Sequence, residues 1–213
     1  MSLIKFYRAD YSSAGVTDAV FRELEAAAGH PLAERIDVAL HTGTRDAAFL
    51  AINPNGFVPA IVPADGVPLW ESAAITMYLG ELHGVDAGLY PEAKTTLRGQ
   101  AMKWIVWSNV NLPMTARQIS RVIHGKKEED ADVQKLREKD AETAKGELEK
   151  QLKVLDGGLE GKNYLLGETY SLADTHIWSF MSYIKMLGVD LDKMGNLKAW
   201  LDRVGAREQL KGL

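Results

Sequence analysis

The spacing of hydrophobic residues changes part of the way along the chain. Before residue 84, short apolar runs that alternate as strands do are interleaved with stretches at helical spacing. The expected strands cover 3–7, 36–40, 58–62 and 67–70, and the expected helices cover 16–27 and 75–82. The Asp65-Gly66 pair between the last two strands is a hairpin turn signal. This β-α-β, β-β-α order predicts a four-stranded mixed sheet with helices packed against it.

Beyond Pro91 the pattern becomes helical throughout. Apolar stripes at helical spacing occupy 97–108, 148–159, 177–184 and 197–204, and they predict a helix bundle. Ser171 and Asp174 fit a capping box at the start of one helix. The segment from Gly84 to Pro91 is rich in helix breakers. We therefore expect an α/β domain over 1–83, a linker over 84–90 and an all-α domain over 91–213.

Composition narrows the function classes. The chain has 213 residues, 46% hydrophobic and 25% charged, as is typical of globular proteins. Cysteine is absent, so disulfides, thiolate metal sites and a catalytic cysteine are excluded. The net charge of −4 argues against a nucleic-acid partner. The start of the chain has no signal-peptide pattern, and no apolar run is long enough to cross a membrane, so we expect a cytoplasmic protein outside membranes.

A proline at the start of an expected strand is the first candidate for chemistry. Val58-Pro59 follows Asn53-Pro54-Asn55-Gly56, and proline is unusual within a sheet. One interpretation is an ordinary edge or turn proline. The other is a cis peptide that turns the Val58 N–H and C=O outward, where they could pair with an extended peptide.

The second candidate is Glu71-Ser72 at the start of a helix. These residues could be no more than N-cap chemistry. A helix N-terminus also binds carboxylates, a hydroxyl donates to them, and a neighbouring Glu accepts from an ammonium group. Together these groups suit the α-amino acid end of a γ-glutamyl group.

These motifs resemble those of the cytosolic glutathione transferase family, which carries N-P-x-G-x-V-P followed by E-S-x-A-I. The resemblance extends through 34–37, 49–54 and 171–174, and the pattern is similar to that of the bacterial beta class. It implies a thioredoxin-like N-terminal domain, an all-helical C-terminal domain, glutathione as co-substrate and a homodimer. It also implies that Val58 pairs with the cysteinyl backbone of glutathione, that Pro59 is cis, and that Glu71 and Ser72 hold the γ-glutamyl end. His41 falls where the class has a basic residue near the glycyl carboxylate, although a surface-loop histidine is an equally good interpretation.

Catalysis would also require a group that lowers the thiol pKa. A free thiol with a pKa of about 8.5 is only about 3% thiolate at pH 7. A donor beside the first helix would favour the thiolate by a hydrogen bond and by the helix dipole. Ser12 resembles the catalytic position of serine-type and beta-class relatives, and we expect it to be this donor. Ser13, Tyr7 and Tyr11 are the alternatives, with Tyr7 better explained as a core residue.

The chain departs from the beta class in two places. Ser12 replaces the class cysteine, and the helical histidine that lines the site in that class is replaced near Pro113. The resemblance places the second substrate between the domains, against helices that carry Trp104, Trp107, Met114 and Arg117, although such aromatics are more often core. No histidine spacing indicates a metal site, and His176 is expected to be structural.

Two functions follow. The first is an enzyme that conjugates the glutathione thiolate to hydrophobic electrophiles, with glutathione peroxidase activity as a possible addition. The second is a glutathione-transferase-like binding module without catalysis. The residues at the glutathione end favour the enzyme.

Overall fold

The alternating segments form one mixed sheet in the computed structural model, which describes residues 2–212. Strand β1 (Ile4–Arg8) pairs in parallel with β2 (Ala33–Asp37) and antiparallel with β3 (Ala60–Val62). Strand β4 (Leu69–Trp70) pairs antiparallel with β3, which gives the order β2-β1-β3-β4. The predicted four-stranded mixed sheet is confirmed.

The second strand is displaced from its expected position. It begins at Ala33 and ends at Asp37, so that Val38 and Leu40 lie beyond it. The Val38 N–H still donates to the Arg8 carbonyl at 2.7 Å, but β1 ends there. Residues beyond Val38 therefore have no neighbour in β1 to pair with, and the apolar alternation placed the second strand three residues too late in the sequence.

The two strands of the hairpin are shorter than expected. Strand β3 begins at Ala60 because Pro59 has no N–H to donate to the sheet. Strand β4 begins at Leu69, since the Val67 N–H donates at 3.0 Å to the Asp65 side chain instead of to a strand. The connection between them contains a turn in which the Gly66 N–H donates to the Pro63 carbonyl at 3.0 Å, at the predicted Asp-Gly pair.

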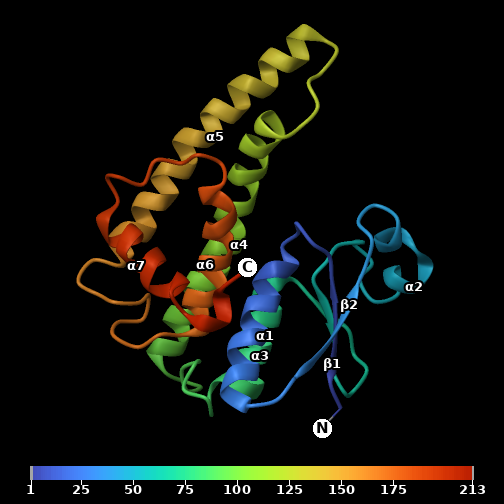
Figure 1. The fold of residues 1–213 in the computed structure, drawn as a ribbon, viewed down its shortest axis with the longest axis vertical. Helices are drawn as coiled ribbons and strands as arrows, with labels where there is room; N and C mark the ends of the chain where they lie inside the picture. The colour runs from blue at the N-terminus through green and yellow to red at the C-terminus, as the bar shows by residue number, and fades with distance from the viewer. Residues whose placement is uncertain (1, 213) are drawn as a thin grey trace.

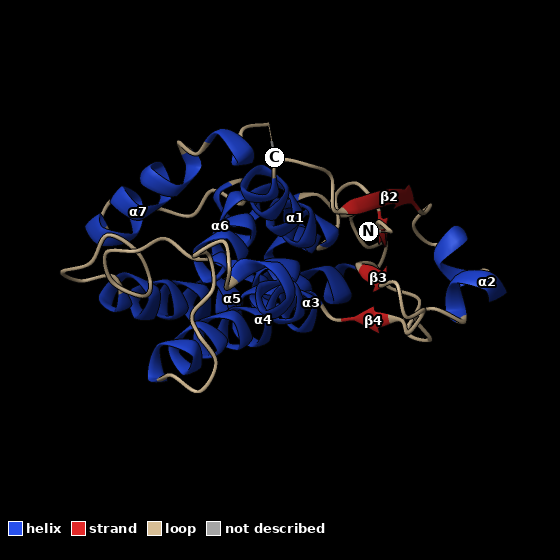
Figure 2. Cartoon of the chain, turned by 90° about the horizontal axis from the view of Figure 1, so that it is seen from below, coloured by secondary structure: helices blue, strands red, loops and turns tan. Residues whose placement is uncertain are grey.

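Helices cover both faces of the sheet (Figures 1 and 2). Helices α1 (Ala14–Ala28) and α3 (Ser72–Leu79) lie on one face, while η1 (Gly43–Arg45) and α2 (Ala47–Leu50) lie on the other. Side chains of β1 alternate between these layers. Phe6 packs against Phe21 of α1 with ring centroids 5.3 Å apart, and Tyr7 packs edge-on against Phe49 of α2 at 5.9 Å.

Helix α3 ends earlier than its apolar spacing predicted. It ends at Leu79 and continues into a π-helical turn, η2 (Gly80–Gly84), which contains Leu82. Gly80 is required here, because a Cβ atom at this position would lie 2.7 Å from the ring of Tyr90. The chain then enters the helical part of the molecule through the segment predicted as a linker.

The described elements after this segment are all helical. They begin with a long antiparallel pair, α4 (Thr96–Ile123) and α5 (Ala131–Gly158), which extends beyond the rest of the molecule (Figure 1). Helices α6 (Leu172–Lys185) and α7 (Gly195–Gly205) follow, and η3 (Glu208–Leu210) ends the described chain. The α/β part followed by a helix bundle, which the spacing of apolar residues predicted, is confirmed. The position of the domain boundary at 84–90 stays a prediction.

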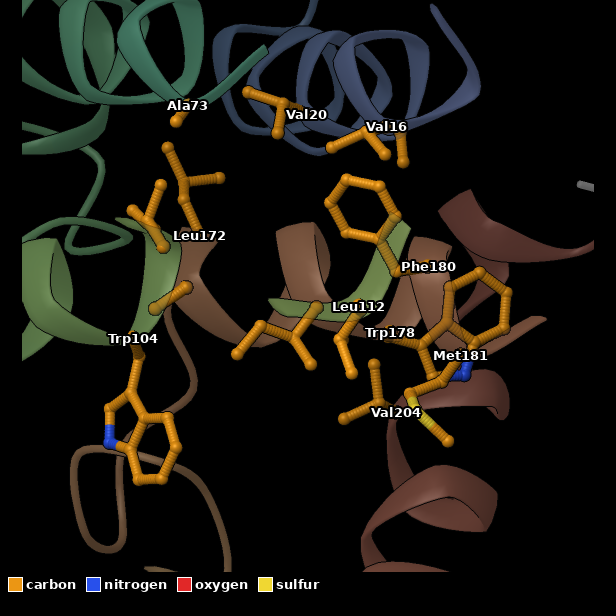
Figure 3. Packing of buried hydrophobic residues seen from close by; sticks show 14 of the residues in the cluster. Val16, Val20, Ala73, Trp104, Leu112, Leu172, Trp178, Phe180, Met181 and Val204 are labelled. Atoms are coloured by element: carbon orange, nitrogen blue, oxygen red, sulfur yellow. The ribbon is translucent and has the colours of Figure 1, made fainter. Parts of the chain in front are cut away.

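The two parts share a continuous apolar core. In Figure 3, Val16 and Val20 of α1 face Phe180 of α6, and Ala73 of α3 faces Leu172 at the start of α6. Helices α1, α3 and α6 therefore meet at the boundary between the parts. This arrangement brings the beginning of α3 against the helical part of the chain, where the candidate site lies.

Candidate functional site

The loop between β1 and α1 holds Ser12 in a closed local arrangement. The Ser12 hydroxyl donates to the Ala9 carbonyl at 2.6 Å, and its oxygen accepts from the Ala14 N–H at 3.2 Å. Tyr11 has a positive φ of 55° and a fully exposed side chain. Ser12 is thus half-buried and bonded within its own loop, where it fixes the start of α1.

Ser13, the next residue, is exposed and directed across the site. Its hydroxyl donates to the Val58 carbonyl at 3.2 Å, which joins the β1–α1 loop to the segment before β3. The Val58-Pro59 peptide bond is cis, as predicted. Ser13 and Val58 therefore come together, whereas the Ser12 hydroxyl is bonded within its own loop.

The turn before Val58 is shaped by its Asn and Gly residues. Buried Asn53 donates from Nδ2 to the Phe57 carbonyl at 2.6 Å and accepts from the Asn55 N–H at 3.1 Å. Gly56 has φ +65°, and a Cβ atom there would lie 2.3 Å from the Arg45 guanidinium. This motif is thus a rigid turn that presents the Val58 backbone.

Glu71 and Ser72 form the start of α3. Glu71 is exposed and has φ +73°, an uncommon conformation for a residue with a side chain. Outliers of this kind are concentrated at functional sites. Ser72 is buried, and its oxygen accepts a hydrogen bond from Nδ2 of Asn109 on α4 at 3.0 Å. The sequence did not single out Asn109.

His41 lies apart from these residues. It has φ +68° in the exposed loop after β2, and its N–H donates to the Thr44 hydroxyl at 3.2 Å. Within residues 2–212, no recorded contact joins its ring to Ser13, Val58 or Ser72. The role of His41 near the glycyl carboxylate therefore stays a prediction.

Tyr7 is a packing residue of the opposite sheet face. It lines a cavity of about 310 Å³ between β1, β2 and α2, together with apolar residues that include Val38 and Phe49. It therefore does not face Ser13 across the loop. The expectation that Tyr7 belongs to the core agrees with this packing.

The aromatic residues of α4 divide between core and surface. Trp104 is buried, and its ring lies against Gly158 of α5, so it does not line an open pocket. Trp107 packs edge-on against Trp104 with centroids 5.4 Å apart. Met114 is 65% exposed. Arg117 is exposed as well, so Met114 and Arg117 are the members of this set that an incoming substrate could contact without rearrangement.

His176 is fully buried on α6. Its Nδ1 lies 2.8 Å from the Thr76 hydroxyl and its Nε2 lies 2.7 Å from Oδ1 of Asn109. Burial lowers the pKa of His176 to about 3, so the ring is neutral at ordinary pH. The imidazole thus connects α6 to α3 and α4. This agrees with the structural role predicted for His176 and adds that the ring joins three helices.

Two classes of feature are not found in the part of the chain that the structure describes. In residues 2–212, no three His, Asp or Glu side chains gather as a metal site would require. The helices over the same range also include none with the length and hydropathy of a membrane span.

Comparison with known proteins connects this geometry to one family. The glutathione S-transferase N-terminal domain model matches residues 30–82, and the C-terminal domain model matches residues 114–208. The disulfide-bond oxidoreductase YfcG of Escherichia coli K12 is 30% identical over 165 residues, which cover 75% of this chain and 72% of that protein. Glutathione S-transferase GST-4.5 of Xanthomonas campestris pv. campestris is 30% identical over 156 residues, covering 73% of each chain.

Solved structures show the same fold. A glutathione transferase from Methylococcus capsulatus strain Bath superposes with a TM-score of 0.79 at 27% identity, covering 98% of this chain and 96% of its own. A glutathione transferase homologue from Sulfitobacter, crystallised with bound glutathione, superposes with a TM-score of 0.78 at 22% identity, covering 99% of this chain and 96% of its own. At that identity the second likeness concerns the fold alone.

Proposed function

The chain belongs to the glutathione S-transferase family, and on this premise we propose that it binds glutathione and transfers its thiolate to hydrophobic electrophiles. In this reaction the glutathione thiol loses its proton to solvent and the sulfur forms a bond to an electrophilic carbon. That carbon either loses a leaving group with its bonding electron pair or, in an activated alkene, gives up its π bond, whose electrons take up a proton on the neighbouring carbon. The observation that carries the proposal is the approach of the Ser13 hydroxyl to the Val58 carbonyl at 3.2 Å. A peptide that pairs with the Val58 backbone would lie with its central residue beside this hydroxyl.

The proposed binding mode uses backbone and side-chain groups together. The Val58 backbone pairs with the cysteinyl residue of glutathione, as in β-strand addition. The free N–H groups at the start of α3 and the Ser72 hydroxyl bind the γ-glutamyl carboxylate, while Glu71 accepts from the ammonium group. His41 would bind the glycyl carboxylate after movement of its loop. The exposure of Glu71 and its positive φ support this assignment.

Within the serine pair, we assign the thiol hydrogen bond to Ser13. Both hydroxyls donate to a backbone carbonyl: Ser12, the residue expected from the sequence, donates to Ala9 at 2.6 Å within its own loop, and Ser13 donates to Val58 at 3.2 Å. Ser13 is the more exposed of the two and its hydrogen bond is the longer, so it is the hydroxyl that a bound thiolate could redirect at lower cost. A hydrogen bond to a charged group contributes about 1.5–3 kcal/mol, or about one to two units of thiol pKa. Ser12 remains the competing candidate.

The thiolate absorbance of bound glutathione tests this assignment. It should be titrated in the wild type, Ser13→Ala and Ser12→Ala. We expect Ser13→Ala to raise the apparent thiol pKa by about one unit or more, and Ser12→Ala to change it less. A larger shift in Ser12→Ala would restore the sequence-based expectation, and no shift in either variant would exclude activation by a loop serine.

Turnover assays separate the enzyme from the binding module. A panel of electrophiles and peroxides with glutathione should show conjugation in the wild type. Reduction of a peroxide is the second candidate activity, and since the chain has no cysteine, two glutathione molecules must supply its electrons. Retention on a glutathione resin with no turnover of any panel member would favour the non-catalytic module.

We also propose that the protein is a homodimer in the cytoplasm. Helix α4 exposes four apolar side chains at successive spacings of four residues, which places them along one face of the helix: Met102, Val106, Val110 and Met114. An apolar stripe of this kind is typical of an association surface. Sedimentation should give a dimer for the wild type and a monomer for Val110→Asp, whereas a monomeric wild type would contradict the proposal.

A further inference from the structure

A chain of hydrogen bonds runs from the middle of α3 through the helical part of the molecule and back to the start of α3. The Thr76 hydroxyl lies 2.8 Å from His176 Nδ1, and His176 Nε2 lies 2.7 Å from Asn109 Oδ1. The Asn109 Nδ2 donates to the Ser72 oxygen at 3.0 Å. Three helices therefore contribute to one network of polar side chains, in which Ser72, Thr76 and His176 are buried and Asn109 is half-buried.

The chemistry of these groups sets the direction of every bond. Asn109 Oδ1 can only accept, so His176 Nε2 carries the proton and Nδ1 accepts from the Thr76 hydroxyl. The Asn109 amide then presents its NH₂ group to Ser72. Because the Ser72 oxygen is 3.0 Å from Nδ2 and 3.4 Å from Oδ1, its closer partner is the donor.

The Ser72 hydroxyl hydrogen has only a long contact of 3.4 Å with Asn109 Oδ1, so a closer acceptor at the start of α3 would take it. A hydroxyl whose oxygen already accepts one hydrogen bond directs its hydrogen elsewhere, and here the start of α3 lies beside it. We propose that Asn109 and His176 are positioning residues that hold the Ser72 hydroxyl as a donor to the carboxylate of the bound γ-glutamyl group. The identity of that carboxylate rests on the proposed glutathione binding.

This arrangement would make the start of α3 selective for an acceptor. A carboxylate would accept the Ser72 hydrogen without reorganisation of the site. A ligand group that is itself a donor would lie against the Ser72 hydroxyl hydrogen and form no hydrogen bond with it. Asn109 and His176 come from α4 and α6 and are separated by 67 residues in the sequence. The helical part of the chain thereby sets the donor character of a residue in the glutathione-binding part.

Asn109→Asp is the sharpest variant. Its carboxylate keeps an acceptor for His176 Nε2, but it turns from a donor into an acceptor toward Ser72 and adds a negative charge. The Ser72 hydrogen should then point inward. We expect glutathione to bind about tenfold more weakly or worse, the effect of one lost charge-assisted hydrogen bond. Gln100→Glu is the matched control, since it adds the same charge on the exposed side of α4, where Lys103 already donates to it.

A second ligand separates positioning from general damage. 4-Aminobutyryl-cysteinylglycine is glutathione without the γ-glutamyl α-carboxylate. Its dissociation constant, measured by calorimetry beside that of glutathione, should change little in Asn109→Asp. A loss of equal size for the two ligands would show a merely structural role and overturn the proposal.

His176 variants test orientation without added charge. His176→Gln can still donate an N–H to Asn109 and accept from Thr76, and it should retain glutathione affinity. His176→Leu has a similar volume but leaves the Asn109 amide free to turn, so it should bind glutathione severalfold more weakly while affinity for the second ligand is kept. Equal affinities in His176→Leu and wild type would overturn the role of His176.

The same measurements distinguish the positioning role of Asn109 and His176 from the proposed glutathione binding on which it rests. A wild-type protein that fails to bind glutathione would refute the proposed function and the ligand assignment together. A wild type that binds glutathione, with Asn109→Asp binding it equally well, would refute only the positioning role. Circular dichroism melting of each variant establishes that the folded protein is being measured.

Discussion

At the scale of the residue, two adjacent glycines near the end of α5 have different surroundings. A Cβ atom at Gly158 would lie 2.4 Å from the ring of Trp104, whereas at Gly157 nothing lies within 4 Å. Gly158 is thus required by close packing of α5 against α4. Gly157 only adds flexibility to a helix.

This difference predicts opposite effects of the same substitution. Gly158→Ala should destabilise the protein by about 1–3 kcal/mol, because the Trp104 ring must move in a packed core. Gly157→Ala should stabilise it by up to about 1 kcal/mol, because the unfolded chain loses freedom. Urea denaturation of the two variants gives the comparison, and equal free energies of unfolding would contradict the packing described.

Single residues also show which features could be predicted from the sequence and which could not. The turn from Asn53 to Pro59 was predictable because its residues are adjacent, and its local chemistry dictates its shape. Ser12 and Ser13 could not be separated in the same way, since either could cap the following helix. Their difference depends on which hydroxyl meets Val58, a contact between residues 45 positions apart.

At the scale of the element, Asp174 does more than cap α6. Its Oδ2 accepts from the Ser171 N–H at 3.0 Å and from the Ser171 hydroxyl at 2.9 Å, and the capping box is present as predicted. Its Oδ1 accepts from the Leu165 N–H at 2.8 Å and from the Trp200 indole at 2.9 Å. One buried carboxylate thus connects α6 to the preceding loop and to α7.

The two members of the capping box should therefore differ in importance. Ser171→Ala should cost about 1 kcal/mol, as for an ordinary helix cap. Asp174→Ala should cost at least about 3 kcal/mol, because the buried donors of Leu165 and Trp200 also lose their acceptor. Chemical denaturation of both variants measures this ratio. Similar losses for the two would mean that the capping box alone accounts for the role of Asp174.

The elements were predictable in type and order but less so in extent. Periodicity identified the four strands, yet it could not show that β1 ends at Arg8 and leaves Leu40 outside the sheet. The four helical stripes were likewise found from spacing. The bond from Asn109 to His176 was not, because the spacing of apolar residues carries no information about which polar side chains of distant helices meet.

At the scale of the whole molecule, Arg207, which follows α7, forms an ion pair with Glu23 of α1. Arg207 donates two hydrogen bonds of 2.6 Å to Glu23, whose side chain is almost fully buried. The Tyr170 hydroxyl donates to the same carboxylate at 2.9 Å. Burial, together with the charge of Glu23, raises the pKa of Tyr170, so the phenol remains a donor.

Loss of Arg207 should destabilise the whole fold. Arg207→Ala leaves a buried carboxylate with one neutral donor, and we expect a cost of about 3–5 kcal/mol. The double variant Glu23→Gln/Arg207→Ala should cost less, because the uncompensated charge is removed as well. Thermal and urea unfolding of the two proteins test this order.

A control lies in the same terminal segment. Lys211 forms an exposed ion pair with Glu208, and Lys211→Ala should change the free energy of unfolding by about 1 kcal/mol or less. If Arg207→Ala proved no worse than Lys211→Ala, the buried pair would not support the fold as described.

The pair between Glu23 and Arg207 also sets an order of events during protein synthesis. The two residues are 184 positions apart, so at about 5–20 residues per second the ribosome adds Arg207 roughly 10–40 s after Glu23. Throughout that interval the nascent N-terminal half carries a carboxylate that it cannot bury at low cost. Helix α1 can therefore reach its final packing only when translation of the chain is nearly complete.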